Sequence, residues 1–142
     1  MDHVAILKDA PLDKILSGVK TMESRWLANK SAPWGKVTVG DTVFFKRSGG
    51  DVEARAIVKD VRQYENVDER LACAIIKTHG TALAIDEKSL GQWHNRAKTR
   101  CCLVFLEDVQ PVNPFSIDKS GFGAMAAWLC VEAGIDAIKR KS

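Results

Sequence analysis

Residues 18–26 read Gly-Val-Lys-Thr-Met-Glu-Ser-Arg-Trp and place three charged side chains, those of Lys20, Glu23 and Arg25, within six positions. The residues before this stretch have the apolar spacing of a helix face, and its second half reads as a strand. We therefore expect the charges to lie where a short helix joins a strand. This is the strongest candidate for a functional site in the chain.

The local pattern predicts how these charges are held. Pro11 suits a first helical position, because its missing N–H would be unpaired there, and Gly18 supplies a permissive stop. In the strand that follows, period-two alternation puts Glu23 and Arg25 on one face. Strict alternation would place Lys20 across the strand from Glu23. A shared pocket therefore requires Lys20 to lie in the turn between helix and strand.

Two interpretations of these charges remain open at the level of sequence. In the first, Glu23 and Arg25 form a solvated ion pair, which contributes less than about 1 kcal/mol. In the second, the charges line a cleft in which Lys20 and Arg25 bind an anion and Glu23 accepts or shuttles a proton. The second interpretation makes Lys20, Glu23 and Arg25 candidate catalytic residues.

The stretch Ile-Leu-Ser-Gly-Val-Lys-Thr-Met-Glu-Ser-Arg at residues 15–25 resembles the G-x-K-x-x-E-x-R signature of the ASCH domain family. The likeness continues through Pro33-Trp34-Gly35-Lys36-Val37 and Val39-Gly40-Asp41, and is loose beyond that region. It implies an α+β fold, a small PUA-like mixed β-barrel with flanking helices. The resemblance also implies that RNA is bound in a cleft between barrel and helix.

Composition limits what the chain can be. A length of 142 residues with 46% hydrophobic content predicts a single domain, residues 1–142, with one core. The net charge of +3 permits polyanion binding but is far below that of a nucleic-acid coat protein. The amino terminus lacks the pattern of a secretory signal, so we expect a cytoplasmic protein with no membrane partner.

Cysteine and histidine usage gives no sign of a metal or cofactor. The four cysteines have no C-x-x-C spacing, and a disulfide is disfavoured in a reducing cytosol. The three histidines are scattered, without the spacing that brings ligands to one metal ion. We expect no metal and no cofactor.

The remaining chain predicts mostly strands. Ser48-Gly49-Gly50-Asp51 has the glycines of a hairpin connection, and the long strand after it should bend at a bulge near residues 59–60. The apolar run 122–131 is too short for the roughly 20 residues of a membrane helix and is read as a buried helix. Strands are expected at 4–7, 37–39, 42–47, 52–64, 101–106 and 115–117, and helices at 69–78 and 87–97.

Several side chains outside the motif could contact nucleic acid. Trp34 lies on a turn-rich loop, where its indole could stack on a base or simply cover the core. Basic side chains supply the positive charge that phosphates need, although each of them could instead be solvated. Near Lys119, the unpaired N–H groups of a helix start could bind a phosphate, or a neighbouring side chain could act as an ordinary N-cap. The candidate nucleic-acid-binding residues are Lys20, Arg25, Trp34, Lys46, Ser48, Lys98, Arg100 and Lys119.

Three functions are consistent with the sequence. The first is a module that binds RNA or a nucleotide. The second is a hydrolase, because the resemblance includes ribonucleases and amidohydrolases that act on N4-acetylcytidine through a Thr–Lys–Glu constellation. Lys20 matches that lysine, but Glu23 occupies the threonine position, so Glu23 would have to act as a general base. The third is an interaction module whose motif charges satisfy one another. The oligomeric state is left open.

Overall fold

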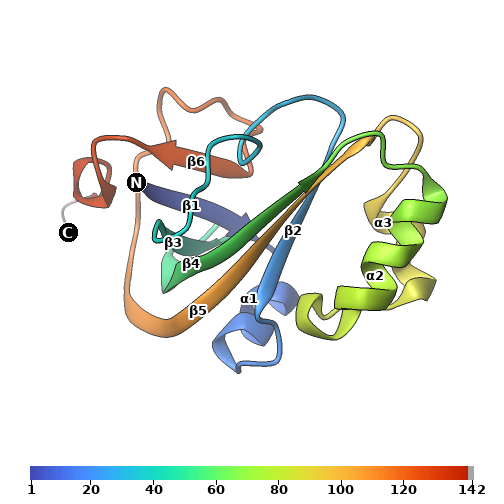
Figure 1. Ribbon diagram of the computed structural model, residues 1–142. Helices are drawn as coiled ribbons and strands as arrows, with labels where there is room; N and C mark the ends of the chain where they lie inside the picture. Colours follow the sequence, from blue (N-terminus) through green and yellow to red (C-terminus); the bar gives the residue numbers. More distant parts are fainter. Residues whose placement is uncertain (141–142) are drawn as a thin grey trace.

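The structure of the protein is a computed structural model, and it describes residues 1–140. Its centre is a six-stranded sheet with the strand order β2-β5-β4-β3-β1-β6 (Figure 1). β1 and β3 are parallel, and every other neighbouring pair is antiparallel. The elements are β1 (Asp2–Leu7), α1 (Asp9–Leu16), β2 (Met22–Leu27), β3 (Thr42–Arg47), β4 (Val52–Tyr64), α2 (Glu69–Leu83), η1 (Glu87–Ser89), α3 (Leu90–Trp93), β5 (Arg100–Phe115), β6 (Trp128–Val131) and η2 (Ile135–Ala137).

The two long central strands shape the sheet. β4 and β5 shift register in three places, one of them between Val58 and Asp60. Each irregularity bends and twists the strand, so the sheet curls into part of a barrel. The predicted bulge near residues 59–60 is thus confirmed. Helices α2 and α3 pack together at one side of the sheet, and α1 lies near the start of β2 (Figure 1).

Several local predictions are confirmed. Gly18 follows α1 with φ of +83°, a conformation that glycine adopts without a steric penalty. The 48–51 connection is a hairpin in which the Gly50 N–H donates to the Arg47 carbonyl oxygen at 2.8 Å. Asp68 caps α2, and its side chain accepts from the Leu71 N–H at 2.8 Å. Residues 101–106 lie in β5, between β2 and β4.

The predicted helix at 122–131 is wrong. Only residues 128–131 form a regular element, strand β6, which pairs with β1. The preceding residues form turns in which Gly121 and Gly123 both have φ of +90°. Glycine weakens a helix interior by about 1 kcal/mol relative to alanine, so these two residues favour turns over a helix. A short apolar run gives no periodicity that distinguishes a strand from a buried helix.

Other boundaries differ from the prediction. The predicted strand at 37–39 is absent, because residues 37 and 38 have no regular structure and residue 39 lies in a turn. The predicted helix at 87–97 shortens to η1 and α3 and ends before an extended His94. Helix α2 continues past Gly80, whose backbone approaches Ile85 so closely that a Cβ would lie 2.6 Å from the Ile85 carbonyl oxygen. The predicted last strand reduces to the end of β5 and an isolated bridge from Ile117 to Lys139. No helix in residues 1–140 is long and apolar enough to cross a membrane.

A buried polar network joins β1, β6 and the turn before β3. His3 is fully buried, and its Nε2 lies 2.8 Å from Asp41 Oδ2. Its Nδ1 accepts the indole N–H of Trp128 at 3.1 Å. Because an indole nitrogen can only donate, Nδ1 carries no proton and the Nε2–H donates to Asp41. The network therefore holds His3 as one neutral tautomer.

This network predicts how acid destabilises the fold. Burial alone would raise the pKa of Asp41, but hydrogen bonds from His3 and Thr38 outweigh it and lower the pKa from 3.8 to about 2. The stabilisation is present above pH 4 and is lost as the pH falls toward 2. We expect the free energy of unfolding to drop by on the order of 2 kcal/mol across this window.

Urea unfolding of the wild type and of Asp41→Asn at pH 7, 4, 3 and 2 measures this loss. The difference in stability between the two proteins should shrink as the pH falls. A constant difference from pH 7 to pH 2 would show that Asp41 has an ordinary pKa in the folded protein.

Candidate functional site

The motif residues line one cleft of about 730 Å³, here called the motif cleft. Its walls come from the end of β1, α1, β2, the end of α2, α3 and the segment that leads into β5. The side chains that matter to its chemistry are those of Lys20, Glu23, Ser24, Arg25, Trp93 and Lys98.

Lys20 lies in the turn between α1 and β2, as a shared pocket required. Its side chain is nearly buried, with 4% of its surface exposed, and Nζ donates to the Leu83 carbonyl oxygen at 2.6 Å. Leu83 is the last residue of α2, where unpaired carbonyls favour a cation. Burial lowers the pKa of Lys20, against the opposing effect of Glu23. Lys20 thus ties α2 to the motif.

Glu23 lies between the two motif cations. Its Oε1 is 3.7 Å from Lys20 Nζ, and its Oε2 is 3.6 Å from Arg25 Nη2. Oε1 also accepts the backbone N–H of Ser24 at 3.1 Å. Only 5% of Glu23 is exposed, so the interpretation as a solvated surface pair is wrong. The carboxylate is charge-compensated, yet neither cation reaches it at hydrogen-bond distance.

Arg25 connects β2 to the far edge of the curled sheet. Nη1 donates to the Ala127 carbonyl oxygen at 3.2 Å, and Nη2 donates to the Ile6 carbonyl oxygen at 3.4 Å. The guanidinium carbon lies 5.3 Å from the centre of the Trp128 ring, a cation–π distance. Arg25 therefore links β2 to β1 and to the segment before β6, in addition to lining the cleft.

Three residues that line the cleft carry buried polar atoms that the protein leaves unpaired. Within residues 1–140, four buried side-chain nitrogen or oxygen atoms have no hydrogen-bond partner, and three of them belong to cleft residues. These are one acceptor, Glu23 Oε2, and two donors, Arg25 Nε and Trp93 Nε1. An unpaired buried polar group costs about 1–3 kcal/mol, and a ligand can supply the missing partner.

The cleft is strongly basic, although the chain as a whole is nearly balanced. Glu23 is its one acidic side chain among the described lining residues. The basic side chains in the lining are Lys8, Lys14, Lys20, Arg25 and Lys98. Opposite charge would therefore be attracted to the mouth of the cleft, where Lys8 and Lys14 are exposed.

Of the predicted site residues, four come together: Lys20, Glu23, Arg25 and Lys98 line the motif cleft. The other five stand outside it. Trp34 packs against the core, with the Arg100 guanidinium 6.0 Å from its ring, and Arg100 itself donates to the Ala28 carbonyl oxygen at 3.0 Å. Lys46 and Lys119 lie near each other but outside the motif cleft. Burial, and then the nearby charge of Lys119, lower the pKa of Lys46. The backbone of Ser48 closes the hairpin against β1.

Sequence reasoning missed four contributors to the site. Lys8 and Lys14 both precede the motif in the sequence, so the positive charge just before residue 18 was a usable signal of a basic site. Trp93 and Trp128 gave no such signal, because an isolated aromatic residue in a sequence is normally interpreted as part of the hydrophobic core. Among the residues that the structure describes, no three His, Cys, Asp or Glu side chains are grouped to hold a metal ion.

No family model matches the sequence, and no curated protein matches it. The structure is similar to that of an ASCH protein from Zymomonas mobilis, with a TM-score of 0.70 at 16% identity, covering 93% of this chain and 89% of that one. A mutant of that protein gives 0.71 at 15% identity, over 92% and 90% of the two chains. A hypothetical protein of solved structure gives 0.54 at 16% identity, over 79% of this chain and 100% of that one. The predicted ASCH-type, PUA-like α+β fold is confirmed.

Proposed function

We propose that this chain, which has the ASCH fold, binds RNA or a nucleotide in the motif cleft. The observation that carries the proposal is the set of unpaired polar atoms on Glu23, Arg25 and Trp93, gathered in one basic cleft. The edge of a nucleobase presents both donors and acceptors, so a base can offer partners to an acceptor and to donors in the same cleft. Lys8, Lys14 and Lys98 supply positive charge for the phosphates.

An interaction module without small-ligand chemistry fits the site less well. That hypothesis predicts motif charges that satisfy one another and no open cleft. Here Glu23 Oε2 has no hydrogen-bond partner in the described chain, and the cleft beside it measures about 730 Å³. The arrangement favours a ligand with hydrogen-bonding groups.

The proposal predicts a salt-dependent affinity for short single-stranded RNA. Lys14→Gln and Lys98→Gln remove charge from the cleft, and each should weaken binding and reduce the slope of log affinity against log salt by about 0.7 per lost phosphate contact. Lys77→Gln is the matched control, because Lys77 is exposed on α2 and lies outside the motif cleft. Fluorescence anisotropy from 50 to 300 mM salt measures both quantities. Equal affinities for all three variants and the wild type would contradict the proposal.

A second candidate function is hydrolysis of RNA or of a modified nucleoside such as N4-acetylcytidine. The observation that favours it is a buried lysine of lowered pKa beside a carboxylate with one unpaired oxygen. Glu23 would activate water as a general base, while Lys20 and Arg25 stabilise the developing negative charge.

Incubation of the protein with short RNA and, separately, with N4-acetylcytidine tests this chemistry, with and without magnesium. Glu23→Gln keeps the shape of the side chain but removes its basicity. We expect it to abolish product formation and to retain RNA binding. Substrate turnover that persists in Glu23→Gln would exclude the general-base role.

A further inference from the structure

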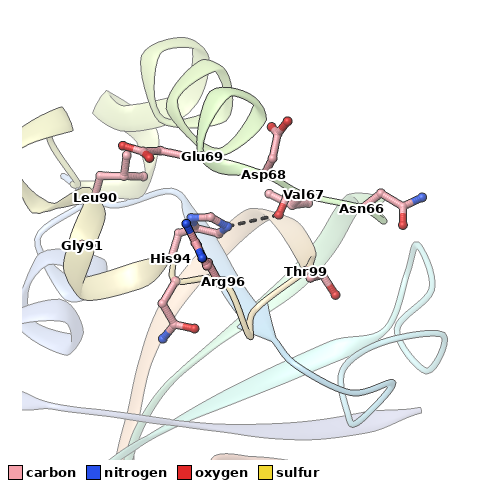
Figure 2. Close-up of a pocket in the computed structure, with 10 residues that line it drawn as sticks. Asn66, Val67, Asp68, Glu69, Leu90, Gly91, His94, Arg96 and Thr99 are labelled. Atoms are coloured by element: carbon pink, nitrogen blue, oxygen red, sulfur yellow. Dashed lines mark hydrogen bonds between the residues drawn. The ribbon is translucent and has the colours of Figure 1, made fainter.

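A second cleft of about 810 Å³ lies beside the motif cleft. It is lined by residues 66–69 around the start of α2, by the first half of α3, and by residues 94–96 and 99. Figure 2 shows His94 and Arg96 in this lining. Helix α3 and the segment after it contribute side chains to both clefts. The two clefts are therefore neighbours built partly from the same piece of chain.

That piece of chain gives each cleft an aromatic ring and a cation. Trp93 and Lys98 line the motif cleft, whereas His94 and Arg96 line the second cleft. An aromatic ring near a cation is the combination that binds a base and a phosphate of single-stranded nucleic acid. The pairing repeats once in each cleft, as two successive nucleotides would require.

The two clefts share a wall. The His94 ring lies edge-on to Trp26, with 6.2 Å between ring centres, and Trp26 lines the motif cleft. The Trp26 indole N–H donates to Ser24 Oγ at 3.0 Å, within the motif itself. His94 is fixed on its other side, because its Nε2 lies 3.1 Å from the Val67 carbonyl oxygen (Figure 2). The ring is thus held at a set position relative to the motif.

The charges of the second cleft restrict how a nucleotide fits there. The Asp68 side chain already accepts the Leu71 N–H as the cap of α2, while Glu69 is exposed in the lining. A phosphate would be repelled from this acidic side and attracted to Arg96. A carboxylate can accept from ribose hydroxyls, so the sugar fits the side of Glu69.

We infer that the second cleft binds the neighbouring nucleotide of an RNA strand whose first nucleotide occupies the motif cleft. His94 stacks on its base, Arg96 contacts its phosphate, and the strand crosses residues 94–99 between the two sites. This inference rests on the proposed function. It adds to that function a preference for a ligand of at least two nucleotides.

Calorimetric titration with ribonucleoside 5′-monophosphates (AMP, CMP, GMP, UMP) and with the 5′-phosphorylated dinucleotides pApA, pCpC, pGpG and pUpU, which carry one phosphate per base, tests the inference. We expect the best dinucleotide to bind at least about tenfold more tightly than the best mononucleotide. Arg96→Gln should remove that gain and leave mononucleotide affinity unchanged. Lys98→Gln should weaken both classes of ligand, and Lys77→Gln neither.

The possible failures are distinguishable. Mononucleotide binding that depends on Lys98, with no gain in the dinucleotide or no effect of Arg96→Gln on it, would overturn the inference and leave the proposed function standing. Absence of binding by every one of these ligands, with binding of the short single-stranded RNA retained, would also overturn the inference alone. Absence of binding by that RNA as well would overturn both. Near-UV circular dichroism of Arg96→Gln establishes that the fold is intact, which is expected because Arg96 is exposed.

Discussion

Replacing Lys20 with methionine is expected to lower the free energy of unfolding by about 3 kcal/mol, the lower end of the range for a buried ion pair that loses one partner. The change removes the donor to the Leu83 carbonyl oxygen, a bond of 2.6 Å at the end of α2. It also leaves the buried Glu23 carboxylate with Arg25 as its remaining counter-charge, at 3.6 Å. Urea denaturation followed by circular dichroism measures the loss.

The double variant Lys20→Met with Glu23→Gln separates the two contributions. If uncompensated charge dominates the cost, removing the carboxylate as well should recover part of the lost stability. A double variant that is as unstable as the sum of the two single variants would instead assign the loss to the helix-end hydrogen bond. A cost below about 1 kcal/mol for Lys20→Met alone would mean that the pair behaves as a solvated one.

The parts of the fold that the sequence predicts correctly are those with a local physical cause. Gly18 ends α1, the glycines at 49 and 50 turn the hairpin, and alternation identifies β4. The failures occur where tertiary pairing decides. Residues 128–131 form a strand because β1 has an open edge beside them, and nothing within the segment itself encodes that edge.

The site follows the same rule. Lys20, Glu23 and Arg25 are close in sequence, so their meeting in one cleft needs only a turn and a strand. Lys98 joins them because β5 pairs with β2 and brings the preceding segment alongside. Lys46 and Lys119 were grouped with them by charge alone, and charge alone does not show on which side of the fold a side chain lies. Distant partners such as Trp128 become visible only once the curl of the sheet brings β6 near the side chain of Arg25.

The second large effect is expected at Trp128, which supports Arg25 from outside the motif. Trp128→Phe keeps a ring under the guanidinium but removes the indole N–H that satisfies His3 Nδ1 at 3.1 Å. Leaving this buried acceptor unpaired should cost about 1–3 kcal/mol of folding free energy. Trp128→Ala also removes the ring and most of a buried side chain, so a loss of about 3–5 kcal/mol is expected.

A double-mutant cycle between Trp128 and Arg25 tests whether the ring positions the guanidinium. Arg25→Gln removes the cation that lies 5.3 Å from the ring centre. If the two side chains act together, the cost of Trp128→Ala should be smaller in the Arg25→Gln background, by about 0.5–2 kcal/mol. Stability is the primary measurement, because it does not depend on any ligand.

RNA affinity provides the second reading of the same cycle. Because Trp128 lies outside the lining of the motif cleft, Trp128→Phe should affect RNA binding only through Arg25. Its effect on affinity should therefore disappear once Arg25 is glutamine. Additive effects in both stability and affinity would mean that Trp128 belongs to the core alone. In that case the position of Arg25 would depend on its bonds to the Ile6 and Ala127 carbonyl oxygens.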